Sequence, residues 1–349
     1  MKTGFRAILV EEVAPGKFDQ RLVERQVQEL PDYPLLVAVS HSSLNFKDAL
    51  SAYGNRAVTR HYPHTPGIDA AGTLISDSSG VFAAGDKILV TGYDLGMNTP
   101  GGHSECICIP SDWALPLPDG LSLREAMILG TAGLTAGLCV EKLLEAGAKP
   151  GDGEVLVTGA TGGVGSIAVA LLAHLGFRVA AVTGKLESTQ YLTALGAQKV
   201  LDRETLAPFA SKAIAKPLWA WAVDTVGGET LFNVVKSLAY GGGVAACGMA
   251  AGAQFQANVF PFILRGISLL GVESVELPLA KKSAVWQRLA GDWYIGRQLD
   301  LIAEDISLEQ VPEFLARLHR GHGIGRYVVD MSLACPEREP LVSRLTAES

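Results

Sequence analysis

The sequence predicts an α/β fold in which a β-rich first part is followed by a doubly wound parallel sheet. Short apolar strands separated by turn residues fill the first third of the chain, and strands then alternate with helices from about residue 129 to 271. A glycine-rich turn lies near the start of the alternating part, between an apolar run and an Ala-rich amphipathic segment. With 349 residues, 48% of them apolar, the chain is long enough for two domains.

The first part is expected to form a twisted, barrel-like sheet, because its strands are short and closely spaced. Residues 1–10 are expected to be a first strand rather than a signal peptide, since two acidic residues follow and no cleavage pattern is visible. Ser122 and Glu125 have the spacing of a capping box at the start of a helix. Further strands are expected at 35–39, 71–75, 87–91 and 105–109.

The alternating part is expected to be a nucleotide-binding domain, and the tail is expected to return to the first domain. Amphipathic helices are predicted at 284–293 and 308–319, followed by a last strand at 325–329. The predicted domains are 1–130 together with 272–349, and 131–271. The candidate parallel strands are 155–157, 179–182, 199–201, 220–224, 243–246 and 268–270.

The glycine turn predicts a dinucleotide site, because it lies inside a strand, turn, helix, strand unit. Gly159 is expected to make the tight turn, Gly162 to let a pyrophosphate approach the backbone, and Gly165 to let the helix pack close to the strand. Free N–H groups at the start of the helix favour an anion. The residues expected to line the pyrophosphate are Thr161, Gly162, Gly163 and Val164.

The residues after the second strand favour NADPH over NADH. An NAD site usually has an acidic residue there, which binds the ribose 2′-hydroxyl and would repel a 2′-phosphate. This chain has Thr183, Gly184 and Lys185 instead, a hydroxyl, a flexible backbone and a cation. The alternative is that Lys185 is an ordinary solvated lysine.

Composition excludes several classes of partner. A net charge of −7 and a pI near 5.6 argue against a nucleic-acid surface, and no apolar stretch is expected to span a membrane. Five cysteines without a framework spacing fit a reducing compartment, so a cytoplasmic protein is expected. Cys106 and Cys108 alternate on one strand face and are expected to pack in the core rather than bind metal.

The chain resembles the medium-chain dehydrogenase/reductase superfamily, and several motifs resemble its zinc-free quinone oxidoreductase branch. This resemblance implies a Rossmann domain together with a GroES-like β-barrel catalytic domain. The branch motifs are residues 43–48 (SLNFKD), 66–72 (PGIDAAG), 130–136 (GTAGLTA) and 223–228 (VDTVGG). The acrylyl-CoA reductase subgroup is similar at 242–249 (GGVAACGM) and 261–266 (PFILRG).

The resemblance implies that no metal is bound. Where zinc alcohol dehydrogenases have ligating Cys and His, this chain has Asn45 and Asp69, and the third ligand position falls near Ala132. The branch commonly has a Tyr after the Asn of this motif, but here the residue is Phe46, which can contact the nicotinamide and cannot transfer a proton.

The activity implied by the resemblance is NADPH-dependent reduction of the double bond of a short enoyl-CoA, such as acrylyl-CoA. Hydride is delivered from nicotinamide C4 to the β-carbon, and the protein stabilises the charge that develops on the carbonyl oxygen. Asn45 and Asp48 are the candidate catalytic residues. Asn45 offers an amide donor, with a structural role about equally plausible, and Asp48 is a structural carboxylate or an orienting group.

The resemblance also implies further site residues. Arg203 is expected to be a second phosphate cation, with a solvated arginine as the alternative. Phe46, Thr135, Met249, Ile263 and Ser274 are expected to wall the nicotinamide. The source of the proton is left open among solvent, Tyr53, His61, Tyr62, His64 and Tyr93. The cations that could meet the phosphates of coenzyme A are Arg56, Arg60, Arg265, Lys281, Lys282 and Arg288.

Two other functions stay open at this point. The first is a quinone or enone reductase with the same cofactor, and the second is a protein that senses NADPH without turnover. The habit of the family and the apolar strand at 268–271 favour a homodimer.

Overall fold

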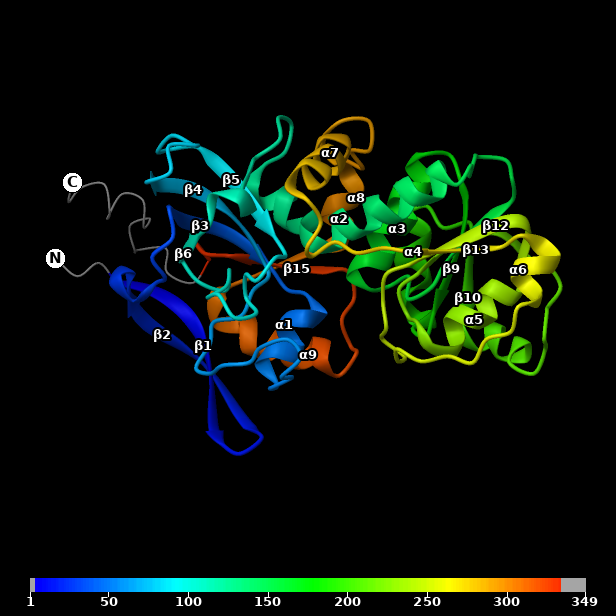
Figure 1. Ribbon diagram of the computed structural model, residues 1–349, viewed down its shortest axis with the longest axis horizontal. Coiled ribbons are helices and arrows are strands. Elements are labelled where there is room, and N and C mark those ends of the chain that lie inside the picture. Colours follow the sequence, from blue (N-terminus) through cyan, green and yellow to red (C-terminus); the bar gives the residue numbers. More distant parts are fainter. Residues whose placement is uncertain (1–3, 334–349) are drawn as a thin grey trace. The chain divides into compact units, whose positions relative to one another are not determined.

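The computed structural model describes residues 4–333 (Figure 1). The chain divides into two compact units. The first contains the residues up to Thr131, Val275–Ala284 and the residues from Ala303 on, and the second contains Ala132–Ser274 and Val285–Ile302. The predicted division at 130/131 and 271/272 differs from these units chiefly in Val285–Ile302, which the prediction grouped with the first domain.

The first unit is built on a seven-stranded sheet with the order β14-β15-β3-β4-β5-β7, in which β6 also pairs with β3. All neighbours are antiparallel except β14 and β15. Strands appear at every expected position of this unit. Their bounds are β3 (Leu35–Ser43), β4 (Asp69–Asp77), β5 (Lys87–Thr91), β6 (Cys106–Ile109), β7 (Leu115–Pro116), β14 (Ala303–Ile306) and β15 (Arg326–Asp330).

A two-stranded hairpin and several short helices complete this unit. β1 (Gly4–Ala14) is the expected first strand, and it pairs with β2 (Lys17–Gln26), which was not predicted. β2 carries mostly charged or polar residues and buries none of them fully, so it lacks the apolar alternation that marks a strand. The helices are η1 (Val27–Glu29), α1 (Phe46–Ala52), η2 (Ser111–Trp113), η5 (Leu308–Gln310) and α9 (Val311–His319).

The second unit is a parallel six-stranded sheet with the order β10-β9-β8-β11-β12-β13. The strand order reverses between β8 and β11, and this switch point is where doubly wound sheets bind ligands at the carboxyl ends of their strands. The strands are β8 (Glu154–Val157), β9 (Arg178–Thr183), β10 (Lys199–Asp202), β11 (Trp219–Asp224), β12 (Leu238–Ala246) and β13 (Ser268–Gly271).

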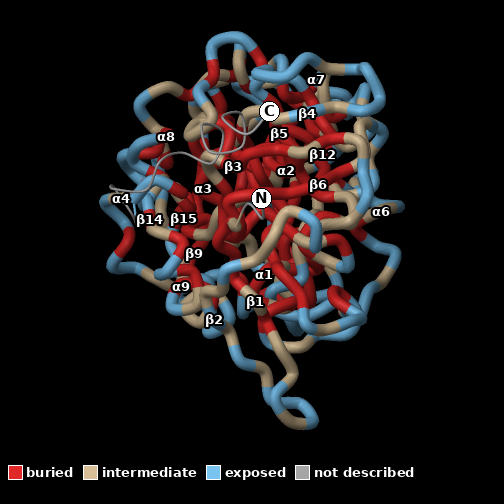
Figure 2. The backbone as a smooth tube through the Cα atoms, turned by 90° about the vertical axis from the view of Figure 1, so that its left-hand side faces the viewer, coloured by how far each residue is buried: buried red, intermediate tan, exposed pale blue. Residues whose placement is uncertain are grey.

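Helices cover this sheet because alternate strand residues point to opposite faces. Leu156, Ala222 and Val244 pack against the apolar side of α5 (Gly228–Lys236), and the alternate residues pack on the side of α3 (Gly163–His174), which is buried over most of its length. Figure 2 shows the buried residues following the strands of the sheets. The smaller elements are η3 (Leu186–Ser188), α4 (Thr189–Ala194), η4 (Arg203–Phe209) and α6 (Phe260–Arg265).

α2 (Leu123–Glu145) begins with the expected capping box, in which Ser122 N donates to Glu125 Oε2 at 2.8 Å and Glu125 N donates to Ser122 Oγ at 3.1 Å. The helix is interrupted at Gly130, whose φ of 51° and ψ of −153° are not helical. Contrary to the sequence-based expectation, α2 is long and apolar enough to cross a bilayer, but 78% of its most apolar window is buried in the protein. Buried core helices commonly have this length and composition.

The return segment forms two helices rather than the single one expected at 284–293. α7 (Leu279–Ala290) begins earlier and α8 (Arg297–Ile302) follows it. Trp286 and Trp293 are 0% and 1% exposed, and this burial explains why the segment packs closely in its unit.

Candidate active site

The glycine turn follows β8 in the second unit, and its glycines have the geometry expected for separate roles. Gly159 has a φ of 59°, in the region that favours glycine. A Cβ at Gly165 would lie 2.3 Å from the Gly159 carbonyl oxygen, so the helix approaches the strand at a distance only glycine permits. A Cβ at Gly162 would meet only that same oxygen, at 3.3 Å, which leaves its outer side open.

The start of α3 provides backbone donors. The N–H of Gly162 donates to the Gly159 carbonyl at 2.9 Å, so it serves the turn itself. The N–H groups of Gly163 and Val164 belong to the first turn of α3, where the helix offers no carbonyl partner. This twelve-residue helix therefore directs free donors toward an anion.

The two threonines predicted for this site lie together at the carboxyl ends of β8 and β9. The hydroxyls of Thr161 and Thr183 are 3.2 Å apart, and both residues are buried. Lys185 N donates to Thr183 Oγ1 at 3.0 Å, which fixes the backbone after β9. Thr183 thus links the glycine turn to the loop that carries Lys185.

Two cations gather at this loop. A Cβ at Gly184 would lie 2.4 Å from guanidinium atoms of Arg203, so Arg203 packs directly on the Gly184 backbone. Burial lowers the pKa of Lys185, Glu187 raises it and the nearby Arg203 lowers it. Lys185 and Arg203 repel one another, and a bound anion with two charges would relieve that repulsion.

A buried carboxylate holds the neighbouring loop in place. Asp224 Oδ1 accepts a 2.6 Å hydrogen bond from the Thr158 hydroxyl, and Oδ2 accepts a 2.7 Å bond from Gly227 N. Burial raises the pKa of Asp224, and these donors lower it. Met249 packs beside Gly227, since a Cβ there would lie 3.0 Å from the Met249 Cα. Met249 is thus close to the glycine turn, with 63% of its surface exposed.

The other residues expected beside the nicotinamide fall into two groups. Thr135 and Ser274 are buried together, with their hydroxyl oxygens 2.8 Å apart. Ile263 lies on α6 and is 70% exposed, and among the described residues no contact brings it to the glycine turn.

A largely buried polar cluster surrounds Asp69 in the first unit. Asp69 Oδ2 accepts hydrogen bonds from the Ser43 hydroxyl and the Asn45 amide, each at 2.7 Å. Thr131 donates from its backbone N to Oδ2 at 2.9 Å and from its hydroxyl to Oδ1 at 2.5 Å. The Arg326 guanidinium lies 3.6 Å from Oδ2. We call these five residues the Asp69 cluster.

Arg326 is only 3% exposed, at the start of β15, and its remaining donors are also used. Nε donates to the Ile128 carbonyl at 3.0 Å, and Nη1 donates to the Leu44 carbonyl at 2.9 Å. Nη1 also donates to Asn45 Oδ1 at 3.1 Å, and Nη2 to Ser43 Oγ at 2.7 Å. Burial lowers the pKa of Arg326, but a guanidinium remains charged in proteins.

The break in α2 at Gly130 lies against the Asp69 cluster. A Cβ at Gly130 would lie 2.4 Å from Asp69 Oδ2 and 2.7 Å from Ser43 Oγ. Glycine is therefore needed at this position for two reasons, the positive φ and the close approach of the Asp69 and Ser43 side chains. The turn directs both donors of Thr131 at the carboxylate, a role that sequence reasoning did not assign.

A zinc ion does not fit this cluster. Both oxygens of Asp69 accept hydrogen bonds, and the charge beside them is the Arg326 guanidinium. Ala132, near which the resemblance implies the third ligand position, has no ligating atom. Within residues 4–333, no group of three or more His, Cys, Asp or Glu side chains could hold a metal ion.

The Asp69 cluster orients Asn45 at the N-cap of α1. Its amide nitrogen faces the carboxylate of Asp69 and its oxygen faces the cation of Arg326, so the orientation of the amide is determined by charge. Asn45 is partly exposed, and the next residue, Phe46, is 49% exposed. One polarised amide and one aromatic ring therefore reach the surface of this unit side by side.

Asp48 is fully buried behind Asn45 and holds the start of α1. Its Oδ2 accepts from Asn45 N at 2.7 Å, and its Oδ1 accepts from Ile68 N at 2.9 Å. His103 Nε2 lies 3.7 Å from Oδ2. Burial raises the pKa of Asp48 to about 7, with Asp69 adding to the rise while the two N–H donors oppose it.

The tautomer of His103 follows from its neighbour Ser42. The Ser42 hydroxyl donates to the Asp69 carbonyl at 2.7 Å, so it can only accept from His103 Nδ1, 3.1 Å away. The proton is therefore on Nδ1, and Nε2 presents a lone pair toward Asp48. Burial lowers the pKa of His103 to about 3, which keeps the ring neutral.

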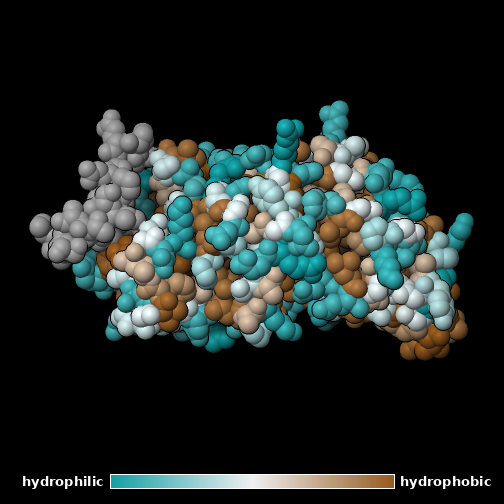
Figure 3. Space-filling model, turned by 90° about the horizontal axis from the view of Figure 1, so that it is seen from above, coloured by the Kyte–Doolittle hydropathy of each residue, from teal (hydrophilic) through white to brown (hydrophobic). Residues whose placement is uncertain are grey.

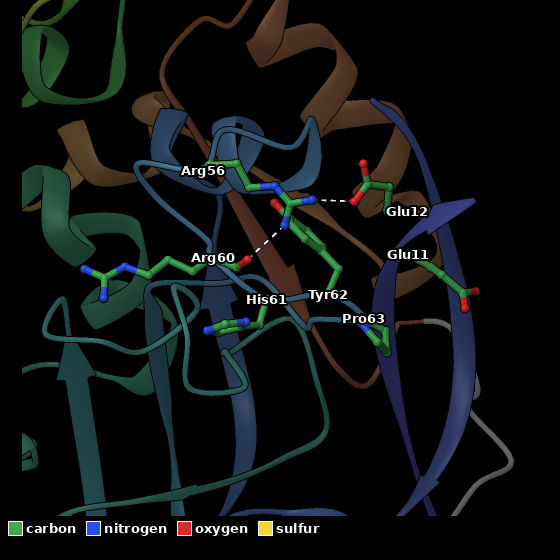
Figure 4. A pocket seen from close by; sticks show the side chains of 7 residues that line it. All are labelled: Glu11, Glu12, Arg56, Arg60, His61, Tyr62 and Pro63. Atoms are coloured by element: carbon green, nitrogen blue, oxygen red, sulfur yellow. Dashed lines mark hydrogen bonds and ion pairs between the residues drawn. The ribbon is translucent and has the colours of Figure 1, made fainter. Parts of the chain in front are cut away.

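Most of the proton-donor candidates are engaged in structural contacts. The Tyr62 hydroxyl donates to the Ser51 carbonyl at 2.5 Å, and the Tyr93 hydroxyl donates to the Leu277 carbonyl at 3.1 Å. Tyr53 stacks on His319 with the rings 4.1 Å apart. His64 is buried, which lowers its pKa. His61 is exposed at the rim of a surface pocket of about 360 Å³ (Figure 4).

The buried Asp48 predicts a specific pH dependence of stability. Its pKa is raised from 3.8 to about 7 in the folded protein, so its contribution is fully present below pH 4 and is lost as the pH rises through 7. The free energy of unfolding of the wild type, minus that of Asp48→Asn, should therefore fall between pH 4 and pH 8. Urea unfolding at four pH values measures this difference.

Asp77→Asn is the matched control, because hydrogen bonds from Ser79, Val81 and Phe82 lower the pKa of Asp77 to about 2. Its difference from the wild type should not fall over the same pH range. A difference for Asp48→Asn that stays constant or rises from pH 4 to pH 8 would contradict the burial argument.

Comparison with known proteins places the chain in a family. Residues 31–119 match the alcohol dehydrogenase GroES-like domain, and residues 163–290 match the domain described as zinc-binding dehydrogenase. The chain is 42% identical over 331 residues to the putative quinone oxidoreductase YhfP of Bacillus subtilis, covering 95% of this chain and 100% of that protein. It is 42% identical over 329 residues to the acrylyl-CoA reductase AcuI of Ruegeria pomeroyi, covering 94% and 99%.

Solved structures agree with this placement. The YhdH oxidoreductase of Salmonella enterica in complex with NADP is similar with a TM-score of 0.90 and 44% identity, covering 93% of this chain and 99% of that one. YhfP of Bacillus subtilis with NAD bound has a TM-score of 0.91 and 42% identity, covering 94% and 100%. This chain therefore belongs to the medium-chain dehydrogenase/reductase superfamily, in the quinone oxidoreductase branch that includes the acrylyl-CoA reductases.

Proposed function

We propose that the protein is an NADPH-dependent reductase of the carbon–carbon double bond of a short enoyl-CoA, such as acrylyl-CoA. The observation that supports NADPH as the cofactor is the pair of cations Lys185 and Arg203. They lie together after β9, where an NAD site would have an acidic residue. The named acrylyl-CoA reductase among the relatives and the NADP-bound YhdH support the choice. NADH is the alternative cofactor to be tested, because the structure of YhfP has NAD bound.

The residues of the second unit would bind NADPH through backbone N–H groups, hydroxyls and cations. Backbone donors of Gly163 and Val164 would meet the pyrophosphate, with Thr161 and Gly162 beside them. Thr183, Gly184, Lys185 and Arg203 would bind the 2′-phosphate. Bound NADPH would supply hydride to the β-carbon of the substrate. Phe46, Thr135, Met249, Ile263 and Ser274 are proposed as the wall of the nicotinamide.

Asn45 is the proposed catalytic donor. One N–H of its amide binds Asp69, and the second makes only a 3.4 Å contact with the Ser43 carbonyl. That second N–H would donate to the thioester carbonyl oxygen, where negative charge develops when hydride reaches the β-carbon. Asp48 is proposed as a positioning residue, because both of its oxygens hold backbone N–H groups.

Quinone reduction is the second candidate, and the name of the Bacillus subtilis relative favours it. The same NADPH site and hydride step would serve a quinone, and Asn45 could donate to its carbonyl oxygen in the same way. An NADPH sensor is the third, since binding folds do not by themselves imply turnover.

Initial rates with acrylyl-CoA, crotonyl-CoA and a benzoquinone distinguish the three functions. The proposal predicts that NADPH is consumed fastest with acrylyl-CoA, and that Asn45→Ala lowers kcat by roughly 10²-fold or more, as loss of an oxyanion donor does. Turnover with the quinone alone would refute the thioester assignment. Tight NADPH binding without turnover of any of the three substrates would favour the NADPH sensor over both enzymes.

The cofactor assignment predicts selective losses in NADPH use. Lys185→Ala and Arg203→Ala should each raise KM for NADPH on the order of tenfold, since each removes a hydrogen bond to a charged group, while KM for NADH should change little. Arg178→Ala is the control, because Arg178 lies at the opposite end of β9. Equal wild-type use of NADH and NADPH would exclude the 2′-phosphate site.

We also propose a homodimer formed through the second unit. β13 pairs only with β12, so its outer edge is unpaired among the described residues, and Leu269 on it is 40% exposed. Figure 3 shows apolar atoms at the end of this unit. The exposed apolar side chains on and beside α6 are Val259, Phe260, Ile263 and Leu264.

Light scattering after size exclusion tests the homodimer. The wild type should have about twice the 36.8 kDa mass of one chain, and Leu269→Lys should shift it toward the monomer by placing like charges across the two-fold axis. Val81→Lys, at a 64% exposed valine of the first unit, should leave the mass unchanged. A monomeric wild type would rule out this interface.

A cytoplasmic location is proposed with these activities. Cys106, Cys108, Cys139 and Cys247 are free thiols, as expected in a reducing compartment. Cell fractionation that recovered the protein in a membrane or secreted fraction would contradict it.

A further inference from the structure

Two fully buried side chains of the first unit, Asp48 and His103, face one another without a hydrogen bond. Asp48 Oδ2 and His103 Nε2 are 3.7 Å apart, and both side chains are 0% exposed. Nε2 has no hydrogen-bonding partner among the described residues. Because Ser42 accepts the hydrogen bond of Nδ1–H, the lone pair of Nε2 points toward the carboxyl group. A lone pair and an ionised carboxylate that face one another away from water are unfavourable, and a proton between them removes the conflict.

The two buried carboxyl groups beside Asn45 differ in what their oxygens accept. Asp69 accepts hydrogen bonds at both oxygens, from the side chains or backbone of three neighbouring residues. These donors occupy its lone pairs, so Asp69 is an ionised carboxylate. Asp48 accepts only one backbone N–H at each oxygen, which leaves a position on Oδ2 that faces His103.

One cation serves both of these carboxyl groups. Arg326 lies 3.6 Å from Asp69, and its charge also acts on Asp48. Two carboxylates and one guanidinium would leave one uncompensated negative charge in the protein interior, whereas a protonated Asp48 leaves none. The direction of the pKa of Asp48 agrees, because burial raises it to about 7 and the charge of Asp69 adds to the rise.

The other titratable neighbours of Asp48 do not alter this balance. His103 stays neutral, because burial lowers its pKa to about 3. Lys47, the next residue toward the start of α1, places its Nζ 4.0 Å from the sulfur of Met97, and no described contact pairs it with Asp48. The charge of the buried group therefore depends on the proton of Asp48.

We propose that Asp48 and His103 together hold one proton, and that this proton keeps the buried groups behind Asn45 free of net charge during the reaction. The proton is bound to Asp48 Oδ2 and is donated to His103 Nε2, for which the two atoms need to approach by only about 1 Å. The same oxygen still accepts the N–H of Asn45 through its other lone pair. His103 is then a positioning residue that acts through Asp48.

The proton matters because negative charge develops beside Asn45, and this part of the inference rests on the proposed reduction of an enoyl thioester. In that reaction the Asn45 amide donates to the carbonyl oxygen that becomes an enolate oxygen. Asp48 Oδ2 is 2.7 Å from Asn45 N, so an ionised Asp48 would add an uncompensated charge of the same sign close by. Hydride transfer should be fastest below the pKa of Asp48, about 7, and should slow as the pH rises through it.

Infrared difference spectroscopy tests the proton without any turnover. The carbonyl stretch of a protonated carboxyl group should be present in the wild type at pH 6 and lost by pH 9, with a midpoint at the pKa of Asp48, about 7. Burial also raises the pKa of Asp224, so the band is assigned by its absence from Asp48→Asn. Asp77→Asn is the control, because hydrogen bonds lower the pKa of Asp77 to about 2, and it should leave the band unchanged.

Ser42→Ala tests the part played by His103. Without the hydroxyl that accepts from Nδ1, the ring is free to carry its proton on Nε2 and to donate it to Asp48, which favours the carboxylate. The loss of the infrared band should therefore move to lower pH by about one pH unit. Ser51→Ala is the matched control, since Ser51 is also fully buried in this unit and its hydroxyl contacts that of Thr59 at 2.6 Å. It should not move the band.

The pH profile of kcat with acrylyl-CoA tests the effect on the reaction. In the wild type, kcat should fall about tenfold or more between pH 6 and pH 9, as expected for one added charge close to the reacting oxygen. The midpoint of this fall should move to lower pH in Ser42→Ala, together with the infrared band, and should stay in place in Ser51→Ala.

Absence of the band from the wild type at pH 6, or its persistence in Asp48→Asn, would overturn the shared proton. If Asp48→Asn does not fold, the band is assigned by its movement in Ser42→Ala, and a band that stays in place there would overturn the role of His103. A kcat that is constant from pH 6 to pH 9 while the band is lost would overturn the effect on catalysis. Absence of thioester turnover would refute the proposed function alone, because the infrared result does not depend on it.

Discussion

The buried carboxylate of Asp69 is the interaction on which the first unit depends. It joins the ends of β3 and β4, the interrupted helix α2 and, through Arg326, the last strand of the sheet. These segments are far apart in the chain, and Asp69 contacts all of them. A buried charge of this kind requires a partner and satisfied hydrogen bonds, and the cluster supplies both. As a consequence of the cluster, the amide of Asn45 is held in a single orientation at the surface of this unit.

The second unit differs from the first in presenting backbone N–H groups, rather than polar side chains, at the start of a helix. The glycine turn and the first turn of α3 supply donors at the strand ends. Thr183 and Asp224 hold the surrounding loops by hydrogen bonds. The cations Lys185 and Arg203 lie together in the loop after β9, where an NAD site usually has an acidic residue. In the first unit, charge determines the orientation of the Asn45 amide.

The parts of the molecule that could be predicted from the sequence are those encoded by neighbouring residues. The glycine turn, the capping box at Ser122 and the apolar strands each have a local pattern, and the structure has them at the expected positions. β2 escaped prediction because most of its residues are charged or polar and none is fully buried. The sequence analysis also did not expect a helix as long and apolar as α2, most of which is buried in the protein.

The Asp69 cluster could be predicted only in part. Asn45 and Asp69 stood out as replacements for metal ligands, but nothing near Arg326 in the sequence indicates a partner more than 250 residues away. The sequence likewise could not indicate that Tyr62 and Tyr93, two of the open candidates for the proton donor, donate their hydroxyls to backbone carbonyl groups.

A double-mutant cycle on Asp69 and Arg326 tests the central claim most directly. The free energy of unfolding should fall by about 3–5 kcal/mol in Asp69→Asn and in Arg326→Met, because each leaves a buried charge uncompensated. The double variant should lose clearly less than the sum of the two, since it leaves neither charge behind. Losses that simply add would contradict the claim that this pair organises the cluster.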